Sequence, residues 1–253
     1  MCAPRETYSS FLRELLERAR RALSLYYDIV EPVVEHPRHR ESLCGCICEL
    51  DLCWSAAETL SELAGEVEGR RVCVAGPLAS GLDYSGCDTV GAPEGGLLPL
   101  VEAGVKPLYV TGDLDVDSKL LPVLLESPRV LLAHVHGDNF SKLEEVLERG
   151  GSLRRPGLVV TSQVETCGCS MPLGGYTDGD RAVLVAMLLG AREVVIAGYS
   201  FSSAVFVHKT RAVAPEYKAV KLALASEVVR EASRIYGYRL RELERGLAVL
   251  EKL

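Results

Sequence analysis

The chain has 253 residues, of which 48% are hydrophobic and 25% are charged, and its formal net charge is −7. This length is sufficient for a full hydrophobic core, and the acidic balance argues against nucleic acid as a partner. Because no apolar run is long enough to cross a membrane and the first residues lack the apolar core of a signal peptide, we expect a cytoplasmic protein with no membrane partner.

Helical patterns fill the first part of the chain. Leu, Arg and Glu recur at helical spacing over residues 6–30, and a second apolar helical stretch covers 40–64, with prolines between the two. Residues 65–71 are the expected joint to the main domain. We therefore predict a helical N-terminal region over residues 1–68 and an α/β domain, which would carry any catalytic site, over residues 69–253.

Cysteines cluster in the N-terminal region with a spacing that matches neither a zinc ribbon nor a ferredoxin. The chain has a single Asn and a single Gln, a depletion of thermolabile amides that is typical of proteins from hot environments. Disulfides occur inside the cells of some such organisms. Free thiols, disulfides and metal ligands therefore all stay open for the cluster, which consists of Cys44, Cys46, Cys48 and Cys53.

From residue 71 onward, predicted strands and helices alternate, which favours a mostly parallel sheet with helices on both faces, a Rossmann-like α/β arrangement. We expect a turn at residues 91–96, and residues 165–176 form a loop long enough for a lid. The expected strands cover 72–75, 89–90, 108–110, 130–135, 158–160 and 194–197. The expected helices are a short one ending at 103, then 118–125, 141–148, 178–189 and about 215–253.

Two carboxylates, Asp113 and Asp115, follow the strand predicted at 108–110. Residues two apart in extended backbone share a face, with Cα atoms roughly 6.5 Å apart. Carboxylates this close favour protonation of one of them or a divalent cation between them. Because open α/β sheets bind ligands beyond the carboxyl ends of their strands, the pair indicates a Mg²⁺ site; a solvated acidic turn is the alternative.

The next strand, 130–135, ends in a run that contains His134, His136, Asp138 and Asn139. The run resembles the His-x-His-x-Asp-His motif of metallo-β-lactamase-like hydrolases, but Asn139 replaces the last His and dinuclear zinc sites need further His residues. We therefore interpret His134 as a hydrogen-bonded core residue and Asp138 as a third carboxylate near the other two.

Further polar groups follow other strands or begin a helix. Residues 76–81 would let backbone N–H groups approach a phosphate at a helix start, although a plain turn is an equal alternative. Asp178 and Asp180 begin a predicted helix and either contact a ligand or only cap the helix. The candidate cationic partners of phosphate, each also a candidate surface charge, are Arg181, Lys209, Lys218 and Lys221.

Five segments carry a family resemblance: Val-Thr-Gly-Asp-Leu-Asp at 110–115, Ala-His-Val-His-Gly-Asp-Asn at 133–139, Thr-Ser-Gln-Val at 161–164, Gly-Gly-Tyr-Thr-Asp-Gly-Asp-Arg-Ala at 174–182 and Val-Ile-Ala-Gly at 195–198. Taken in order, they resemble the archaeal 6-hydroxymethyl-7,8-dihydropterin pyrophosphokinases, whose catalytic fold is related to thiamin pyrophosphokinase. One departure is the Ala-Asp-Gly block of the family, which is Gly-Ala-Pro-Glu-Gly here, so an acidic role there would pass to Glu94.

The resemblance implies Mg²⁺-dependent transfer of a diphosphoryl group from ATP to the pterin hydroxymethyl group, with release of AMP. The implied partners are small molecules, ATP and a pterin alcohol, and a homodimer stays open. The implied catalytic and metal-binding residues are Asp113, Asp115 and Asp138. The implied nucleotide-binding residues are Gly76, Ser80, Gly137, Asn139, Thr177, Asp178, Asp180, Arg181 and Lys221, and the implied substrate-binding residues are Thr161 and Gln163.

Three alternatives stay open on the sequence. Asp113 and Asp115 also fit the Asp-x-Asp site of a metal-dependent glycosyltransferase that uses a nucleotide-sugar. Gly112 makes the acidic turn similar to that of thiamin pyrophosphokinase, so the acceptor alcohol is not fixed. The missing Ala-Asp-Gly block favours the third, a nucleotide-binding module without catalysis.

Overall fold

The computed structural model describes residues 10–30, 53–135, 139–150, 157–162, 170–200, 215–242 and 247–253. Within these residues a nine-stranded sheet runs in the order β6-β5-β4-β3-β2-β1-β7-β9-β8. Neighbours from β6 to β7 are parallel, whereas β9 is antiparallel to both β7 and β8. The strands are β1 (Arg71–Ala75), β2 (Thr89–Pro93), β3 (Tyr109–Gly112), β4 (Val130–Val135), β5 (Gly157–Ser162), β6 (Met171–Pro172), β7 (Glu193–Ala197), β8 (Tyr238–Glu242) and β9 (Ala248–Lys252).

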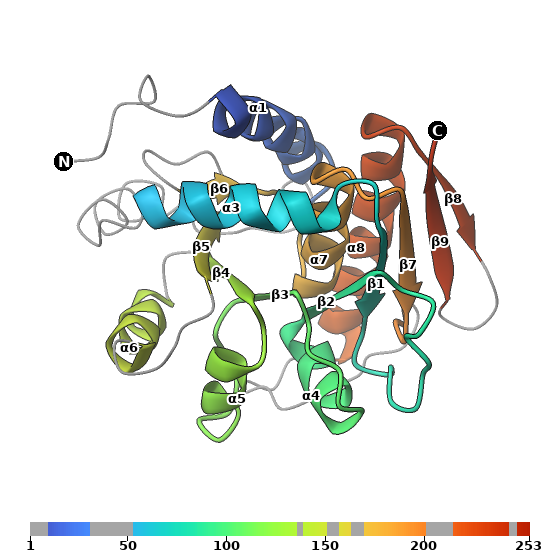
Figure 1. The fold of residues 1–253 in the computed structure, drawn as a ribbon. Helices are drawn as coiled ribbons and strands as arrows, with labels where there is room; N and C mark the ends of the chain where they lie inside the picture. The colour runs from blue at the N-terminus through green and yellow to red at the C-terminus, as the bar shows by residue number, and fades with distance from the viewer. Residues whose placement is uncertain are drawn as a thin grey trace.

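Helices cover both faces of this sheet, which confirms the predicted α/β class (Figure 1). One face packs against α1 (Ser10–Leu25), the following π-helical turn η2 (Tyr26–Val30), α3 (Cys53–Val67), α7 (Asp178–Leu188) and α8 (Pro215–Ile235). The other face packs against α4 (Glu94–Glu102), α5 (Leu121–Glu126) and α6 (Phe140–Gly150). Each face has its own hydrophobic core because parallel strands with two covered faces bury nearly every side chain.

Helix α7 crosses the middle of the sheet from its carboxyl edge to its amino edge. At its start, the Thr111 hydroxyl of β3 donates a hydrogen bond to the main-chain carbonyl of Asp178, at 2.7 Å. One turn on, the Tyr109 hydroxyl donates to the Ala182 carbonyl at 2.7 Å. Beyond its end, the Gly190 carbonyl accepts from Gly69, just before β1. The helix start is therefore fixed over the carboxyl end of β3.

The turn predicted at residues 91–96 is wrong. Strand β2 continues to Pro93, and α4 begins directly at Glu94. Gly91 is a strand residue paired with Tyr109, and a Cβ at Gly91 would overlap the Tyr109 ring. Gly96 lies in α4, where a Cβ would overlap the main chain of Ala75. These glycines allow close packing rather than a turn.

The C-terminal part also differs from the prediction, because the helix expected over 215–253 ends at Ile235. Gly237 follows with φ of 73°, the left-handed conformation that commonly ends a helix, and the chain then forms the antiparallel strands β8 and β9. Arg239 and Arg241 on β8 both pair with Glu251 on β9, at 2.8 and 3.0 Å.

The lid predicted at residues 165–176 is only partly described. Residues 163–169 lie outside the described part of the chain, and β6 occupies Met171–Pro172 at the edge of the sheet, paired with β5. Residues 170–176 are buried, so this portion is packed structure and not a lid.

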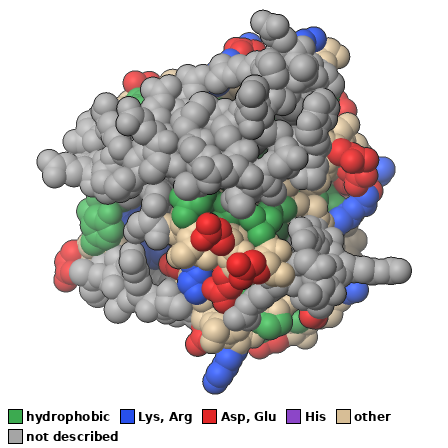
Figure 2. All heavy atoms as spheres, turned by 90° about the vertical axis from the view of Figure 1, so that its left-hand side faces the viewer, with side chains coloured by type: hydrophobic (Ala, Val, Ile, Leu, Met, Phe, Trp, Pro, Cys, Tyr) green, Lys and Arg blue, Asp and Glu red, His purple; other side chains and the backbone are tan. Residues whose placement is uncertain are grey.

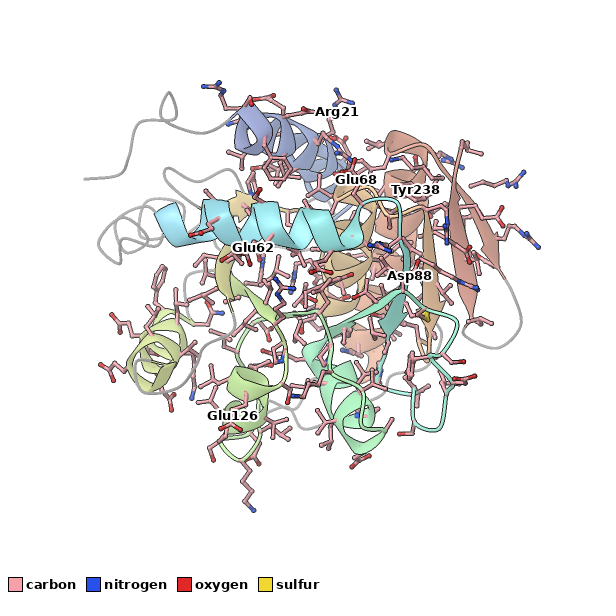
Figure 3. All side chains as sticks on the ribbon, in the orientation of Figure 1. Arg21, Glu62, Glu68, Asp88, Glu126 and Tyr238 are labelled. Carbon is pink, nitrogen blue, oxygen red and sulfur yellow. A yellow bond between two sulfur atoms is a disulfide. The ribbon has the colours of Figure 1, made fainter. Side chains whose placement is uncertain are left out.

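The surface carries charges of both signs. On the face shown in Figure 2, acidic side chains gather in the middle of the described surface with basic ones beside them. Glu62 and Glu66 on α3 both pair with Arg129, just before β4, at 3.4 and 2.7 Å; Glu62 is labelled in Figure 3. Among the described helices, none combines the length and apolarity needed to cross a membrane.

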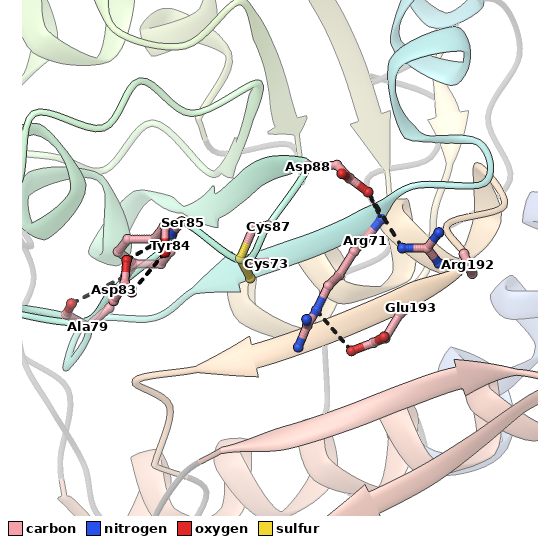
Figure 4. Close-up of a disulfide and its surroundings, with 10 residues drawn as sticks. All are labelled: Arg71, Cys73, Ala79, Asp83, Tyr84, Ser85, Cys87, Asp88, Arg192 and Glu193. Carbon is pink, nitrogen blue, oxygen red and sulfur yellow. Dashed lines mark hydrogen bonds and ion pairs between the residues drawn. A yellow bond between two sulfur atoms is a disulfide. The ribbon is translucent and has the colours of Figure 1, made fainter.

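A disulfide joins Cys73 on β1 to Cys87 in the loop before β2, with Cα atoms 5.8 Å apart (Figure 4). Beside it, the Arg71 main-chain N–H donates to Asp88 at 2.7 Å, and the Arg71 side chain pairs with Glu193 at 3.0 Å. These contacts fasten the start of β1 to both neighbouring strands. The side chains of Cys44, Cys46, Cys48 and Cys53 lie outside the described part of the chain, so their state stays a prediction.

Reduction of the Cys73–Cys87 disulfide should lower the free energy of unfolding by about 3 kcal/mol, the value for a closed loop of about 15 residues. The measurement is denaturant unfolding with and without reductant. The double variant Cys73→Ala, Cys87→Ala is the control, because any reductant effect left in it comes from the other cysteines. An equal reductant effect in the wild type and the double variant would contradict the prediction.

Candidate active site

The acidic turn after β3 is built around Leu114, which has φ of 62° and lies between Asp113 and Asp115. The left-handed conformation costs a residue with a side chain roughly 1–2 kcal/mol. Leu114 is fully buried in the core beneath α4 and α5, and this burial offsets the cost. The extended geometry predicted for Asp113 and Asp115 is therefore wrong, because the chain turns sharply between them.

Glu94, the first residue of α4, directly follows the neighbouring strand β2 and holds this turn. Its Oε1 accepts a hydrogen bond from the Leu114 main-chain N–H at 2.8 Å, and its side chain is buried. Glu94 passes directly over Gly112, where any Cβ would overlap its carboxylate. Gly112 is therefore required by the close approach of Glu94 and not by its own backbone conformation.

The three carboxylates of Glu94, Asp113 and Asp115 converge. Each offers an oxygen, and these oxygens lie within 4.8 Å of one another. Hard oxygen donors at such separations fit the ligand preference of Mg²⁺. The structure thus brings the predicted pair together and adds Glu94, the residue to which the sequence assigned any acidic role after β2. Asp138 lies outside the described part of the chain.

Asn139 supports the acidic turn from the end of β4. Its Nδ2 donates to the main-chain carbonyls of Asp113 and His134, at 2.8 and 2.7 Å, and the residue is buried. The nucleotide contact suggested by the sequence for Asn139 stays a prediction, and the structure shows that its amide nitrogen joins the ends of β3 and β4. His136 and Gly137 lie outside the described residues.

The start of α7 is held by a capping box. The Asp180 carboxylate accepts hydrogen bonds from the main-chain N–H groups of Tyr176 and Thr177, at 2.7 and 2.6 Å, and from the Thr177 hydroxyl at 2.8 Å. Burial raises the pKa of Asp180, while Arg181 and these hydrogen bonds oppose the rise. Asp180 thus has the capping role that the sequence left open as an alternative.

Arg181 is buried and pairs with Asp178 at 2.6 Å, one turn apart on the same helix. The surface position considered for Arg181 is therefore wrong. Asp178 is in turn fixed to β3, because its main-chain carbonyl accepts the Thr111 hydroxyl. The pair places one charge of each sign at the helix start, beside the carboxyl end of β3.

Lys221 reaches the same region from α8. Its Nζ lies 4.9 Å from the ring centroid of Tyr176, the residue before the helix cap. Burial lowers the pKa of Lys221 and nearby Arg181 and Lys218 act in the same direction, whereas Asp178 and Asp113 raise it. The charges of Asp178 at the start of α7 and of Asp113 in the acidic turn therefore both act on Lys221. Lys209 lies outside the described residues.

His134 and Thr161 form a buried pair on neighbouring strands, with 3.0 Å between Nδ1 and Oγ1. This confirms the interpretation of His134 as a hydrogen-bonded core residue. Thr161, a predicted substrate contact, directs its hydroxyl to His134, and Gln163 lies outside the described part of the chain.

The loop after β1 does not lead into a helix, so the predicted phosphate site at a helix start is wrong there. The Gly76 and Leu78 N–H groups donate to the carbonyls of Ala197 and Gly198, at 2.7 and 2.9 Å. A Cβ at Gly76 would lie 2.5 Å from the Gly198 oxygen, so Gly76 permits close contact between the ends of β1 and β7. Ser80 is exposed on this loop.

No protein-family model matches the chain. Three curated archaeal proteins, each named 6-hydroxymethyl-7,8-dihydropterin pyrophosphokinase, are similar to it. The protein from Pyrococcus furiosus is 39% identical over 116 residues, which is 45% of this chain and 46% of the relative. The protein from Methanothermobacter thermautotrophicus is 33% identical over 117 residues, 46% of this chain and 48% of the relative.

The third relative, from Methanocaldococcus jannaschii, is 25% identical over 112 residues, 43% of this chain and 45% of that protein. The matched part of the chain therefore spans about half the length of the curated relatives. The resemblance inferred from the motifs is confirmed as a similarity to proteins of that name.

The substitution Gly112→Ala should lower the free energy of unfolding by about 1–3 kcal/mol, because the added Cβ overlaps the Glu94 side chain and displaces it from Leu114. Gly65→Ala is the matched control. Gly65 lies in α3 with no heavy atom within 4 Å of an added Cβ, so that variant should be unchanged or slightly stabilised. Urea unfolding of both variants measures the difference; equal midpoints would contradict the packing of Glu94 over Gly112.

Proposed function

We propose that the protein transfers a diphosphoryl group from ATP to the hydroxymethyl group of 6-hydroxymethyl-7,8-dihydropterin, with release of AMP, in a Mg²⁺-dependent reaction. The observation that carries the proposal is the convergence of Glu94, Asp113 and Asp115 within 4.8 Å at the ends of β2 and β3. The similarity of about half the chain to proteins with that name supports the choice of reaction.

In this proposal Asp113, Asp115 and Glu94 hold Mg²⁺, with Asp138 as a further ligand suggested by the sequence. Bound Mg²⁺ would neutralise negative charge on the phosphate oxygens. Glu94 has two separate tasks, because Oε1 accepts the Leu114 N–H while the carboxylate also faces the two aspartates. The donor set is made only of carboxylate oxygens, which suits this ion.

The start of α7 is the proposed nucleotide contact. This helix start is fixed beside β3 by the Thr111 hydrogen bond, and Lys221 lies beside it against the Tyr176 ring, so a cation is available there for a phosphate oxygen. We assign Thr177, Asp178 and Lys221 to the nucleotide and Gln163 to the edge of the pterin ring, where an amide both donates and accepts. Asp180, Arg181 and Asn139 would act by holding these groups in place.

Four further residues are proposed to line the same edge of the sheet without a defined contact. They are Gly76 and Ser80 after β1, Gly137 after β4 and Thr161 on β5. A reaction on two small molecules agrees with an expected location in the cytoplasm. A homodimer stays open.

A metal-dependent glycosyltransferase is the second candidate, because Asp113 and Asp115 in the cluster also fit an Asp-x-Asp site. The two functions differ in their products. Incubation with ATP, Mg²⁺ and the hydroxymethyl pterin, followed by separation of the nucleotides, should yield AMP and no ADP. Absence of AMP, together with turnover of a nucleotide-sugar, would replace the proposed function by the second candidate.

Asp113→Asn should lower the rate of AMP formation at least 100-fold, because it removes a charged oxygen from the proposed metal site. The overall fold should persist, since the change is isosteric. Asp117→Asn is the matched control: Asp117 is exposed in the same loop, where it accepts the Lys119 main-chain N–H, and its variant should retain the wild-type rate within about twofold. Full activity of Asp113→Asn would remove the metal assignment.

Glu94→Gln separates the two tasks of Glu94. The amide oxygen can still accept the Leu114 N–H, so thermal unfolding should change little, whereas the Mg²⁺ concentration for half-maximal activity should rise about tenfold or more. Glu94→Ala removes the acceptor as well and should cost a further 1–3 kcal/mol or so of stability. An unchanged Mg²⁺ requirement in Glu94→Gln would limit Glu94 to the structural task.

A further inference from the structure

Lys221 lies between two tyrosine rings that come from different parts of the chain. Its Nζ is 4.9 Å from the ring centroid of Tyr176 and 5.8 Å from that of Tyr217. Both separations are within the range in which an ammonium is attracted to an aromatic face. The two tyrosine hydroxyls also share a hydrogen bond of 3.0 Å, so the rings are tied to each other as well as to the lysine.

The two rings are held to different degrees. Tyr176 is buried, and its main-chain N–H donates to Asp180, so the capping box of α7 fixes its position. Tyr217 is 43% exposed and lies four residues before Lys221 on α8, which places both on one helix face. The pair of hydroxyls therefore joins the first turn of α8 to the start of α7.

Charged groups of both signs act on the ammonium. Asp178 at the start of α7 and Asp113 in the acidic turn attract it, and Arg181 and Lys218 repel it. A free lysine side chain loses rotamer entropy when it is immobilised. Because the two rings already restrict Lys221 in the free protein, the side chain loses less entropy when a ligand binds.

We propose that Tyr176 and Tyr217 are positioning residues that hold the Lys221 ammonium beside the start of α7, where it binds a phosphate oxygen of the nucleotide. The inference rests on the proposed function for the nature of the ligand. It adds that α8 takes part in nucleotide binding through Lys221, whose position depends on the Tyr217 ring.

The test compares two substitutions of Tyr217, whose exposure makes a loss of folding small. Tyr217→Leu removes the ring, and Tyr217→Phe removes only the hydroxyl. The probe is α,β-methylene-ATP with MgCl₂, and its dissociation constant is measured by calorimetry. Tyr217→Leu should weaken binding about tenfold, whereas Tyr217→Phe should stay within about threefold of the wild type. Val220→Ala, an exposed change on the same helix, is the control and should bind as the wild type does.

The role of Lys221 is tested by repeating Tyr217→Leu in a Lys221→Met background. If the Tyr217 ring acts through Lys221, Tyr217→Leu should not weaken probe binding further in the Lys221→Met background, so the effects of the two substitutions will be non-additive. An equal weakening in both backgrounds would overturn the inference, as would wild-type binding by Tyr217→Leu. Binding of the probe without AMP formation from ATP and the pterin overturns the proposed reaction alone. No binding of the probe by the wild type overturns both.

Discussion

The hydrogen bond from the Leu114 N–H to Glu94 is the contact on which the acidic site depends. It joins the ends of β2 and β3 and stabilises a leucine in the left-handed conformation, while Gly112 provides the space through which Glu94 reaches it. Without this contact the buried Leu114 N–H would lose its acceptor, and the turn that brings Asp113 to Asp115 would lose its support. A single carboxylate thus shapes the site and contributes to its charge.

The placement of α7 connects this turn to the rest of the fold. Tyr109, on the strand that precedes the turn, lies over Gly91 and bonds the Ala182 carbonyl, and Thr111 bonds the carbonyl of Asp178. In both hydrogen bonds a side chain of β3 donates to a main-chain carbonyl of α7, so the two bonds fix the distance between the helix and the sheet. The helix start, its capping box and the lysine that Tyr176 holds therefore all lie at a position set by β3.

The sequence was sufficient to predict the alternation of strands and helices, which follows from hydrophobic spacing, and the position of Asp113 and Asp115 after the end of a strand, which follows from parallel topology. It was not sufficient at Gly91, since a glycine required by a ring on the adjacent strand looks the same as one required by a turn. It also missed β8 and β9, whose charged positions are stabilised by pairing of Arg239 and Arg241 with Glu251 across strands. Such requirements arise from partners distant in the chain. The left-handed conformation of Leu114 belongs to this group, because Glu94 supplies the contact that supports it.

The charge arrangement favours a ligand that combines negative groups with a metal ion. Three carboxylates within 4.8 Å repel one another and also repel a free polyphosphate, so an anion alone is a poor match for the site. A divalent ion alone would satisfy the carboxylates but would not use Lys221, which lies beside the start of α7 against the Tyr176 ring. In the proposed function, Glu94, Asp113 and Asp115 would hold the cation of a metal-bound polyphosphate, and Lys221 would contact its outer oxygens. The presence of Arg181 and Lys221 near the acidic cluster, in addition to the cluster itself, therefore supports the proposed nucleotide substrate.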